Sequence, residues 1–383
     1  MKPLLATLVL ACLPRPAAGD ATLKIATLAP EGSSWMKLAR EWQRAVEART
    51  AGRVRIKFYP GGLQGDERDM LRKMRLGQLG GAQLTAIGLA ALEPETSGLG
   101  VARTAEDLDE ARAVLGDRLR ARLEDKGYVL LGWGDVGPIH LFSNRPVRSL
   151  DDLAALRLWM WSDDPLTRKL FDALGLHGVA LGIPEVLPAL STGQIDAFFA
   201  SPLAALALQW ASHARYATAA VMGQATGATV IARAAWEAVA PEDRRAILEE
   251  SHALERRVIA EVRADNARAL DSLKSRGLEI VATPPALERE LTERGLKVAD
   301  EAGAAFTPEY RALVQQLVER LRARRTRSPG AGGRSGHPAR SRRSQPCLRG
   351  GCGIPGRIAL SPQRYDPDVQ GIQMIRIATE LHL

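Results

Sequence analysis

The stretch GWGDVG, residues 132–137, has the G-x-G-x-x-G spacing of a dinucleotide-binding loop. In that chemistry the glycines let the backbone approach a pyrophosphate, which lies at the N-terminus of the helix that follows. Here Gly137 is followed by Pro138 and the extended pattern IHLFSN, which has no helical period. Trp133 also stands where the backbone would have to approach the phosphate. We therefore interpret the stretch as a glycine-rich strand connection, and we expect no cofactor.

Other catalytic or metal-binding patterns are weak. The histidines of the body, His140, His177, His213 and His252, are not paired at metal-ligand spacing, and there is no G-x-S-x-G nucleophile elbow. The acidic run GDERD, residues 65–69, is more typical of a helix start than of a metal site. The sequence therefore favours a protein that is not an enzyme and that holds no metal.

Tryptophan is the unusual feature. Trp35, Trp133, Trp159 and Trp161 all fall at the ends of expected elements, at a helix start, at strand ends or in linkers. In open α/β sheets such ends face the ligand crevice. Any one of them could equally be a core residue beneath a loop, but the four together favour an aromatic-lined cleft.

The positive charge of the chain is confined to its C-terminal part. Residues 322–383 hold twelve arginines against three acids, a net of +9, so the total of +8 leaves −1 for residues 1–321. A nearly neutral body does not indicate a nucleic-acid partner. Residues 325–383 have almost no apolar periodicity and are expected to form a disordered basic tail. An out-of-frame extension explains this tail better than a segment that touches anionic lipid or nucleic acid.

The N-terminus has the pattern of a targeting segment. Lys2, an apolar run and Ala17-Ala18-Gly19 predict a signal peptide over residues 1–19, and hence a periplasmic protein. Lipidation at Cys12 is a minor alternative. Residues 20–346 contain no cysteine, so the body is expected to have neither disulfides nor a thiolate metal site.

Hydrophobic periodicity predicts an α/β fold. The expected strands at 22–30, 53–60 and 82–88 alternate with two helices, which implies parallel pairing. The first helix starts at Ser33 or Ser34, and Asp66 caps the second. Further helices are expected at 104–126, from Ser149, at 165–175, at 184–193 and at 241–276, and further strands at 128–131, 139–144, 157–161 and 195–201.

Several of these segments resemble one known family. LKIATLAPEGSSWMKLAREW, TAGRVRIKFYPGGLQGDERDMLRKMRLGQL, SNRPVRSLDDLAALRLWMW and LSTGQIDAFFASPLAALALQW resemble the periplasmic solute-binding proteins of TRAP transporters, the DctP-like family. The resemblance covers about residues 22–324. LLGWGDVG and WMWSDDP look most like the subgroup that is paired with a periplasmic TPR-repeat protein.

The resemblance implies a two-lobe periplasmic solute-binding fold, with the ligand in a cleft between the lobes and a long helix that packs on both. The expected division is lobe I at 20–137, lobe II at 138–229, a return to lobe I with the spanning helix at 230–283, and C-terminal helices at 284–324. The protein would deliver a small-molecule ligand to a membrane permease of one small and one large subunit. An envelope interaction or scaffold protein that keeps the fold without transporting a ligand is the alternative.

Two family positions that contact the ligand differ here. The family arginine that binds a ligand carboxylate corresponds to Trp159, and the family asparagine corresponds to Ser201. Arg157 lies on the same strand face as Trp159 and is a possible cation. We therefore expect an apolar or aromatic-stacking ligand rather than a dicarboxylate. The expected ligand-binding residues are Trp35, Gln64, Trp133, Trp159, Trp161, Phe199 and Ser201.

The segment 91–108 is also unlike the family. It is shorter than the usual apolar stretch and poor in aromatic residues, so one wall of the cleft is expected to be altered.

Overall fold

The computed structural model describes residues 20–162, 165–291, 293–294 and 306–327. The expected signal peptide and nearly all of the basic tail lie outside these ranges. No helix within them is both long and apolar enough to cross a membrane.

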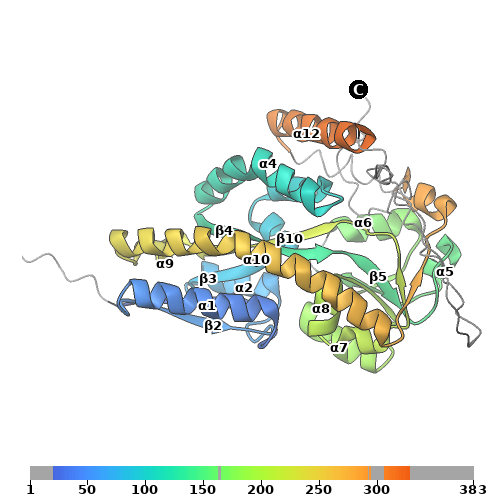
Figure 1. The fold of residues 1–383 in the computed structure, drawn as a ribbon, viewed down its shortest axis with the longest axis horizontal. Helices are drawn as coiled ribbons and strands as arrows, with labels where there is room; N and C mark the ends of the chain where they lie inside the picture. The colour runs from blue at the N-terminus through green and yellow to red at the C-terminus, as the bar shows by residue number, and fades with distance from the viewer. Residues whose placement is uncertain (1–19, 163–164, 292, 295–305, 328–383) are drawn as a thin grey trace, which may run out of the picture.

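The first lobe is built on a five-stranded sheet of order β2-β1-β3-β10-β4 (Figure 1). Its strands are β1 (Ala21–Thr27), β2 (Val54–Tyr59), β3 (Gly81–Thr85), β4 (Tyr128–Pro138) and β10 (Gln224–Ala232). The first three strands pair in parallel, as their alternation with helices predicts, and β10 runs antiparallel between β3 and β4.

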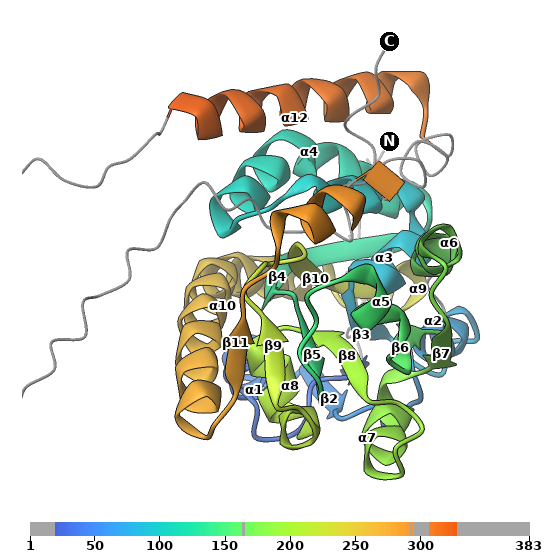
Figure 2. The ribbon, with the colours of Figure 1, turned by 90° about the vertical axis from the view of Figure 1, so that its right-hand side faces the viewer.

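The second lobe is built on a six-stranded sheet of order β11-β9-β5-β8-β6-β7 (Figure 2). Its strands are β5 (His140–Ser143), β6 (Leu158–Trp161), β7 (Gly178–Leu181), β8 (Ala197–Ala200), β9 (Tyr216–Thr218) and β11 (Glu279–Val281). The chain therefore enters this lobe after β4 and leaves it before β10. The expected boundary at 229/230 falls inside β10, so the return to the first sheet comes earlier than the sequence suggested.

The helices of the first lobe form because apolar residues recur at helical spacing behind a capping side chain. In α1 (Ser34–Arg49) Ser33 accepts a hydrogen bond from the Met36 amide, and Leu38, Trp42 and Val46 are buried on one face. Asp66 caps α2 (Glu67–Arg75), where its carboxylate accepts a hydrogen bond from the Glu67 amide over 2.9 Å. The other helices of this lobe are α3 (Ala86–Leu92), η1 (Pro94–Val101), α4 (Ala105–Asp125) and α9 (Arg233–Glu237).

The remaining helices cover the second lobe or join the two lobes, except the last, which packs on α4 and η1 of the first lobe. They are α5 (Leu150–Ala154), α6 (Pro165–Leu174), α7 (Ile183–Ser191), α8 (Pro202–Ala207), η2 (Trp210–His213), α10 (Pro241–Ser275) and α12 (Pro308–Arg327). The long helix α10 packs against α1 and β4 at one end and against α8 at the other (Figure 1). It therefore spans both lobes, as the family resemblance implied.

The unusual segment 91–108 is packed rather than loose. In η1 the Glu95 carboxylate binds Arg118 of α4 at 2.8 Å, and the Tyr310 hydroxyl of α12 donates to the Glu95 carbonyl. Gly98 lies against the Tyr310 ring, where any β-carbon would clash. The C-terminal helix thus holds this segment in place, and the segment forms an ordered wall of the first lobe.

Candidate functional site

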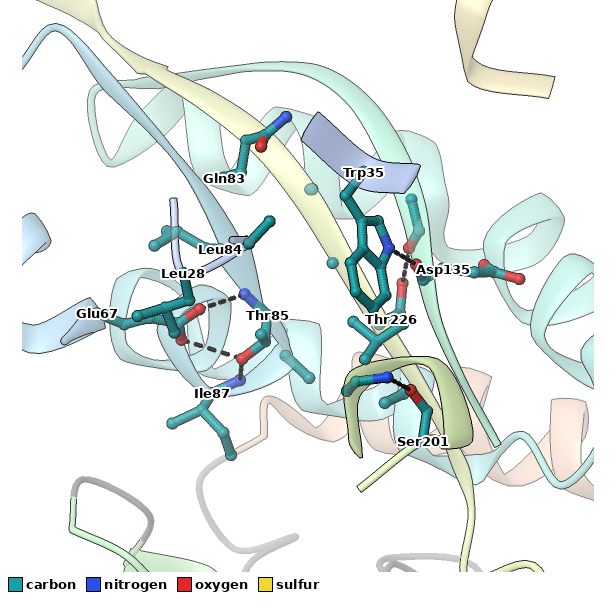
Figure 3. A pocket seen from close by; sticks show the side chains of 18 of the residues that line it. Leu28, Trp35, Glu67, Gln83, Leu84, Thr85, Ile87, Asp135, Ser201 and Thr226 are labelled. Carbon is teal, nitrogen blue, oxygen red and sulfur yellow. Dashed lines mark hydrogen bonds between the residues drawn. The ribbon is translucent and has the colours of Figure 1, made fainter. Parts of the chain in front are cut away.

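A cavity of about 900 Å³ lies between the two sheets and continues along the first lobe. The first lobe lines it with residues at and beyond the ends of β1 and β3, among them Leu28, Thr85 and Ile87 (Figure 3). The second lobe contributes side chains from β6, β8, α7 and α8. The lining is formed mostly by apolar and aromatic side chains, with a few polar groups among them, as in many small-molecule sites.

The two lobes touch at the rim of this cavity. The Trp161 indole of β6 donates to the Asp66 carboxylate at the start of α2 over 2.7 Å, and the Ile183 amide donates to the same oxygen over 3.2 Å. Gly182 lies so close that a β-carbon there would be 2.8 Å from Asp66. These contacts join lobe to lobe, so the structure represents a closed arrangement.

Six of the seven residues expected at the site line the cavity, namely Trp35, Trp133, Trp159, Trp161, Phe199 and Ser201. Gln64 does not, because its side-chain oxygen accepts a hydrogen bond from Lys73 Nζ at 3.0 Å on the flank of α2. Arg157 also lies elsewhere. Its guanidinium binds Asp196 at 3.0 Å. Trp159 therefore faces the cavity without a neighbouring arginine.

The tryptophans are held by their indole nitrogens. Trp35 donates to the Asp135 backbone carbonyl over 3.1 Å (Figure 3). Trp159 donates to the Leu181 carbonyl over 3.0 Å and packs against Trp161 and Trp210, with ring centroids 5.9 and 5.3 Å away. Because their polar atoms are already bonded, these rings offer the cavity mainly apolar surface.

Trp133 and Ser201 have structural roles as well. Trp133 belongs to the core between the first sheet and α4, so only part of it reaches the cavity. Ser201 is fully buried and caps α8 by accepting from the Ala204 amide over 3.2 Å (Figure 3). Its hydroxyl proton is still able to donate a hydrogen bond.

Glu67 is a buried carboxyl group in the cavity wall that the sequence did not single out. It accepts hydrogen bonds from the Thr85 amide at 2.6 Å and the Thr85 hydroxyl at 3.0 Å (Figure 3), and also from the Gly88 amide at 2.7 Å. Burial raises its pKa to about 7, although these three donors act in the opposite direction. Since Thr85 and Gly88 lie in a different element, no local pattern could have revealed the contact.

Asp135, the polar residue inside the glycine motif, is buried in an ion-pair network. It binds Arg112 of α4 at 2.7 Å and Arg263 of α10 at 2.6 Å. The glycine motif itself lies wholly within β4, which is paired to β10 along its length. The interpretation of the stretch as a strand connection is therefore confirmed, and its backbone links the two lobes.

The cavity has little positive charge. Among the described residues that line it, Lys169 on the exposed side of α6 is the only lysine or arginine. A carboxylate ligand would ordinarily be held by a guanidinium fork. The position expected to provide one is occupied by Trp159, whose indole faces the cavity instead.

A cavity enclosed by two α/β lobes, with a helix across both, defines a two-lobe solute-binding protein. Residues 25–304 match the family described as bacterial extracellular solute-binding protein, family 7, also called DctP, and the chain belongs to this family. Members of the family are binding receptors that work with membrane permeases, and several relatives are named as periplasmic proteins.

Solved structures of TRAP solute-binding proteins share the fold. DctP7 of Bordetella pertussis, solved with pyroglutamic acid, superposes with a TM-score of 0.72 at 21% identity, over 78% of this chain and 99% of that one. A protein from Chromohalobacter salexigens with bound D-glucuronate gives 0.71 at 20% identity, again over 78% and 99%. A protein from Ralstonia eutropha with bound (S)-2-acetolactate gives 0.72 at 22%, over 79% and 99%.

Curated relatives are similarly distant. The 2,3-diketo-L-gulonate-binding periplasmic protein YiaO of Escherichia coli is 24% identical over 63% of this chain and 75% of its own length. The C4-dicarboxylate-binding protein DctP of Rhodobacter capsulatus is 25% identical over 73% and 85%. An uncharacterized protein of Sinorhizobium fredii is 31% identical, but the match spans only 48% of this chain and 34% of that protein. None of these similarities singles out the subgroup with a TPR partner, which stays a prediction.

Proposed function

We propose that this protein is the extracytoplasmic binding component of a TRAP-type secondary transporter. It captures a small, largely apolar or aromatic ligand between its lobes and delivers it to a membrane permease of one small and one large subunit. A signal peptide over residues 1–19 would export it to the periplasm, where a TPR-repeat protein is a further candidate partner. The observation that carries the proposal is the cavity between the lobes, together with the family to which the chain belongs.

The ligand class is argued from what lines the cavity. Relatives of known structure were solved with acids, such as D-glucuronate. Here Trp159 takes the position of the expected arginine, and Trp161 and Phe199 add further apolar surface. Away from Lys169, a carboxylate in such a lining would lose its hydration without gaining a charge partner. An acidic ligand is therefore disfavoured relative to a neutral one.

Mass spectrometry of the purified protein, under conditions that preserve complexes, tests the proposal. A bound small molecule should co-purify, and returning it to the stripped protein should raise the unfolding temperature and change tryptophan fluorescence. A protein that carries nothing and responds to no ligand pool would instead fit the scaffold alternative.

Succinate and malate are the sharpest test of the ligand class. Neither should stabilise the protein. Micromolar affinity for either acid, abolished by Trp159→Ala, would contradict an apolar ligand while leaving transport itself intact.

A further inference from the structure

Part of the cavity lies outside the cleft between the lobes. Beyond Trp35 it continues between α1 and α10, over the outer face of β4. We call this part the α1–α10 compartment. Its walls are formed by Leu38, Trp42, Leu131, Ser251, Leu254 and Val258. None of these residues belongs to the second sheet, so this space is not produced by the meeting of the two lobes.

We propose that the α1–α10 compartment binds the hydrocarbon chain of an amphiphilic ligand, whose neutral polar head lies in the cleft beside Glu67 and Thr85. The proposal rests on the proposed function, since it describes the same ligand, and it adds a second binding subsite with its own chemistry. Three observations support it: the apolar walls, the satisfied polar groups at the inner end, and the size of the cavity in the closed arrangement.

The polar groups of the compartment are largely occupied. At its inner end the Trp42 indole donates to the Ser251 hydroxyl over 3.1 Å, and that hydroxyl donates to the Ile247 carbonyl over 2.7 Å. Both groups are buried and neither lacks a partner. A polar ligand group placed here would lose its bonds to water and find no replacement, whereas a hydrocarbon loses nothing.

Glu255 is the charged residue of this region. Its carboxylate lies beside β4, at 3.1 Å from where a β-carbon of Gly132 would be. A negative charge at this place disfavours an anionic group in the compartment. The carboxylates of the cleft are already bonded, Asp135 by Arg112 and Arg263 and Glu67 by three donors. A neutral chain with a neutral, hydrogen-bond-donating head therefore fits better than a cation or an anion.

The length of the compartment and the volume of the cavity agree with a bound hydrocarbon chain. From Trp35 to Trp42 the helix α1 advances about 10 Å at 1.5 Å per residue, and α10 advances as much from Ser251 to Val258. The whole cavity measures about 900 Å³ although Asp66 and Trp161 already hold the lobes together. That volume is near the upper end of the range of about 300–1,000 Å³ for drug-sized ligands. A short acid would leave most of it empty.

A series of straight-chain primary alcohols, from butanol to dodecanol, tests the proposal on the purified protein stripped of ligand. Each alcohol has one donating head and a chain of defined length. Calorimetry should show affinity rising about fourfold with each methylene that enters the compartment, the equivalent of about 0.8 kcal/mol per group. The rise should stop once the chain fills the roughly 10 Å between Trp35 and Trp42.

Two variants locate the chain. Gly132→Val places a side chain where only the mobile end of Glu255 must give way, and Val258→Phe narrows the compartment from α10. Both should lose most of the gain in affinity that the unmodified protein shows from butanol to octanol and decanol. Ala260→Val, on the exposed face of α10 and outside the cavity wall, is the matched control and should keep the gain per methylene. Circular dichroism checks the folding of each variant.

Affinity independent of chain length, failure of every alcohol to bind, or a gain per methylene that survives in both blocking variants would overturn the inference. The proposed function is judged separately, by the small molecule that co-purifies with the protein. A short polar molecule recovered in that experiment would preserve the transport role and exclude the chain.

Discussion

At the scale of single residues, Glu67 is a cavity-lining carboxyl group whose ionised form is disfavoured by burial. Its pKa is raised from 4.5 to about 7 by burial. The proton is therefore held more tightly in the folded protein than in the unfolded chain. The stability that this group contributes is fully present below about pH 4.5 and is lost as the pH rises through 7. A shift of this size corresponds to about 3 kcal/mol.

We expect Glu67→Gln to remove that part of the pH dependence. Urea unfolding at about pH 5 and about pH 8 should show a larger loss of stability with rising pH in the unmodified protein than in the variant. The variant should be less stable at both pH values, because an amide cannot accept all three hydrogen bonds. The comparison is therefore between the changes in the free energy of unfolding with pH, not between its absolute values. Parallel pH profiles would show that Glu67 is ionised normally.

At the scale of elements, α10 is fastened to both lobes by one buried side chain. Asn266 donates to the Val136 carbonyl of β4 over 3.0 Å and accepts from the Leu203 amide of α8 over 3.1 Å. Gly137, at φ +120°, leaves room for this amide, because a β-carbon there would be 2.3 Å from it. Asn266 thus binds both the connecting strand β4 and helix α8 of the second lobe from a single turn of α10.

We expect Asn266→Ala to lower the free energy of unfolding by about 1–3 kcal/mol, since two buried backbone groups lose their partner. Arg268→Ala on the exposed face of the same helix, which removes only a surface pair with Asp265, should change it by no more than about 0.5 kcal/mol. Chemical denaturation measures both. Equal effects of the two substitutions would mean that α10 is held by apolar packing alone.

Periodic elements could be predicted from the sequence, and contacts between distant elements could not. The helices α4 and α10 lie within one residue of their expected bounds, and α1 begins where it was expected. Each has an apolar face, and its start is marked by a capping side chain in α1 and α4 and by Pro241 in α10. The strand β10 was missed because its sequence, QATGATVIA, shows no alternation, being buried between β3 and β4. The cleft tryptophans could be predicted because tryptophan is rare and stands at the ends of elements. Glu67 could not, because its position in the cavity wall depends on hydrogen bonds to Thr85 and Gly88, which belong to other elements.

At the scale of the whole molecule, the hydrogen bond between Trp161 and Asp66 is one of the contacts that join the two lobes. Trp161→Phe keeps an aromatic ring but removes the donor of this 2.7 Å bond to a carboxylate oxygen. The unliganded variant should populate open forms more and show a larger radius of gyration by small-angle scattering. Ligand affinity should fall by the same factor by which the closed population falls.

Trp159→Phe is the matched control for closure. The bond that it removes, to the Leu181 carbonyl, lies within the second lobe. Its scattering curve should therefore match that of the unmodified protein. If both variants expand equally, the loss of packing among the tryptophans, rather than the contact between the lobes, is responsible.

The wall formed by α3 and η1 has a consequence for how such a receptor diversifies. Its cavity side is made of small residues, Ala90, Ala91, Ser97 and Gly100, while its reverse side is fixed to α4 and α12 through Glu95 and Tyr310. Enlarging any of the small residues would reshape the binding space and leave the supporting contacts untouched. Selection could thus change which solute is bound in single mutational steps, without passing through unstable intermediates.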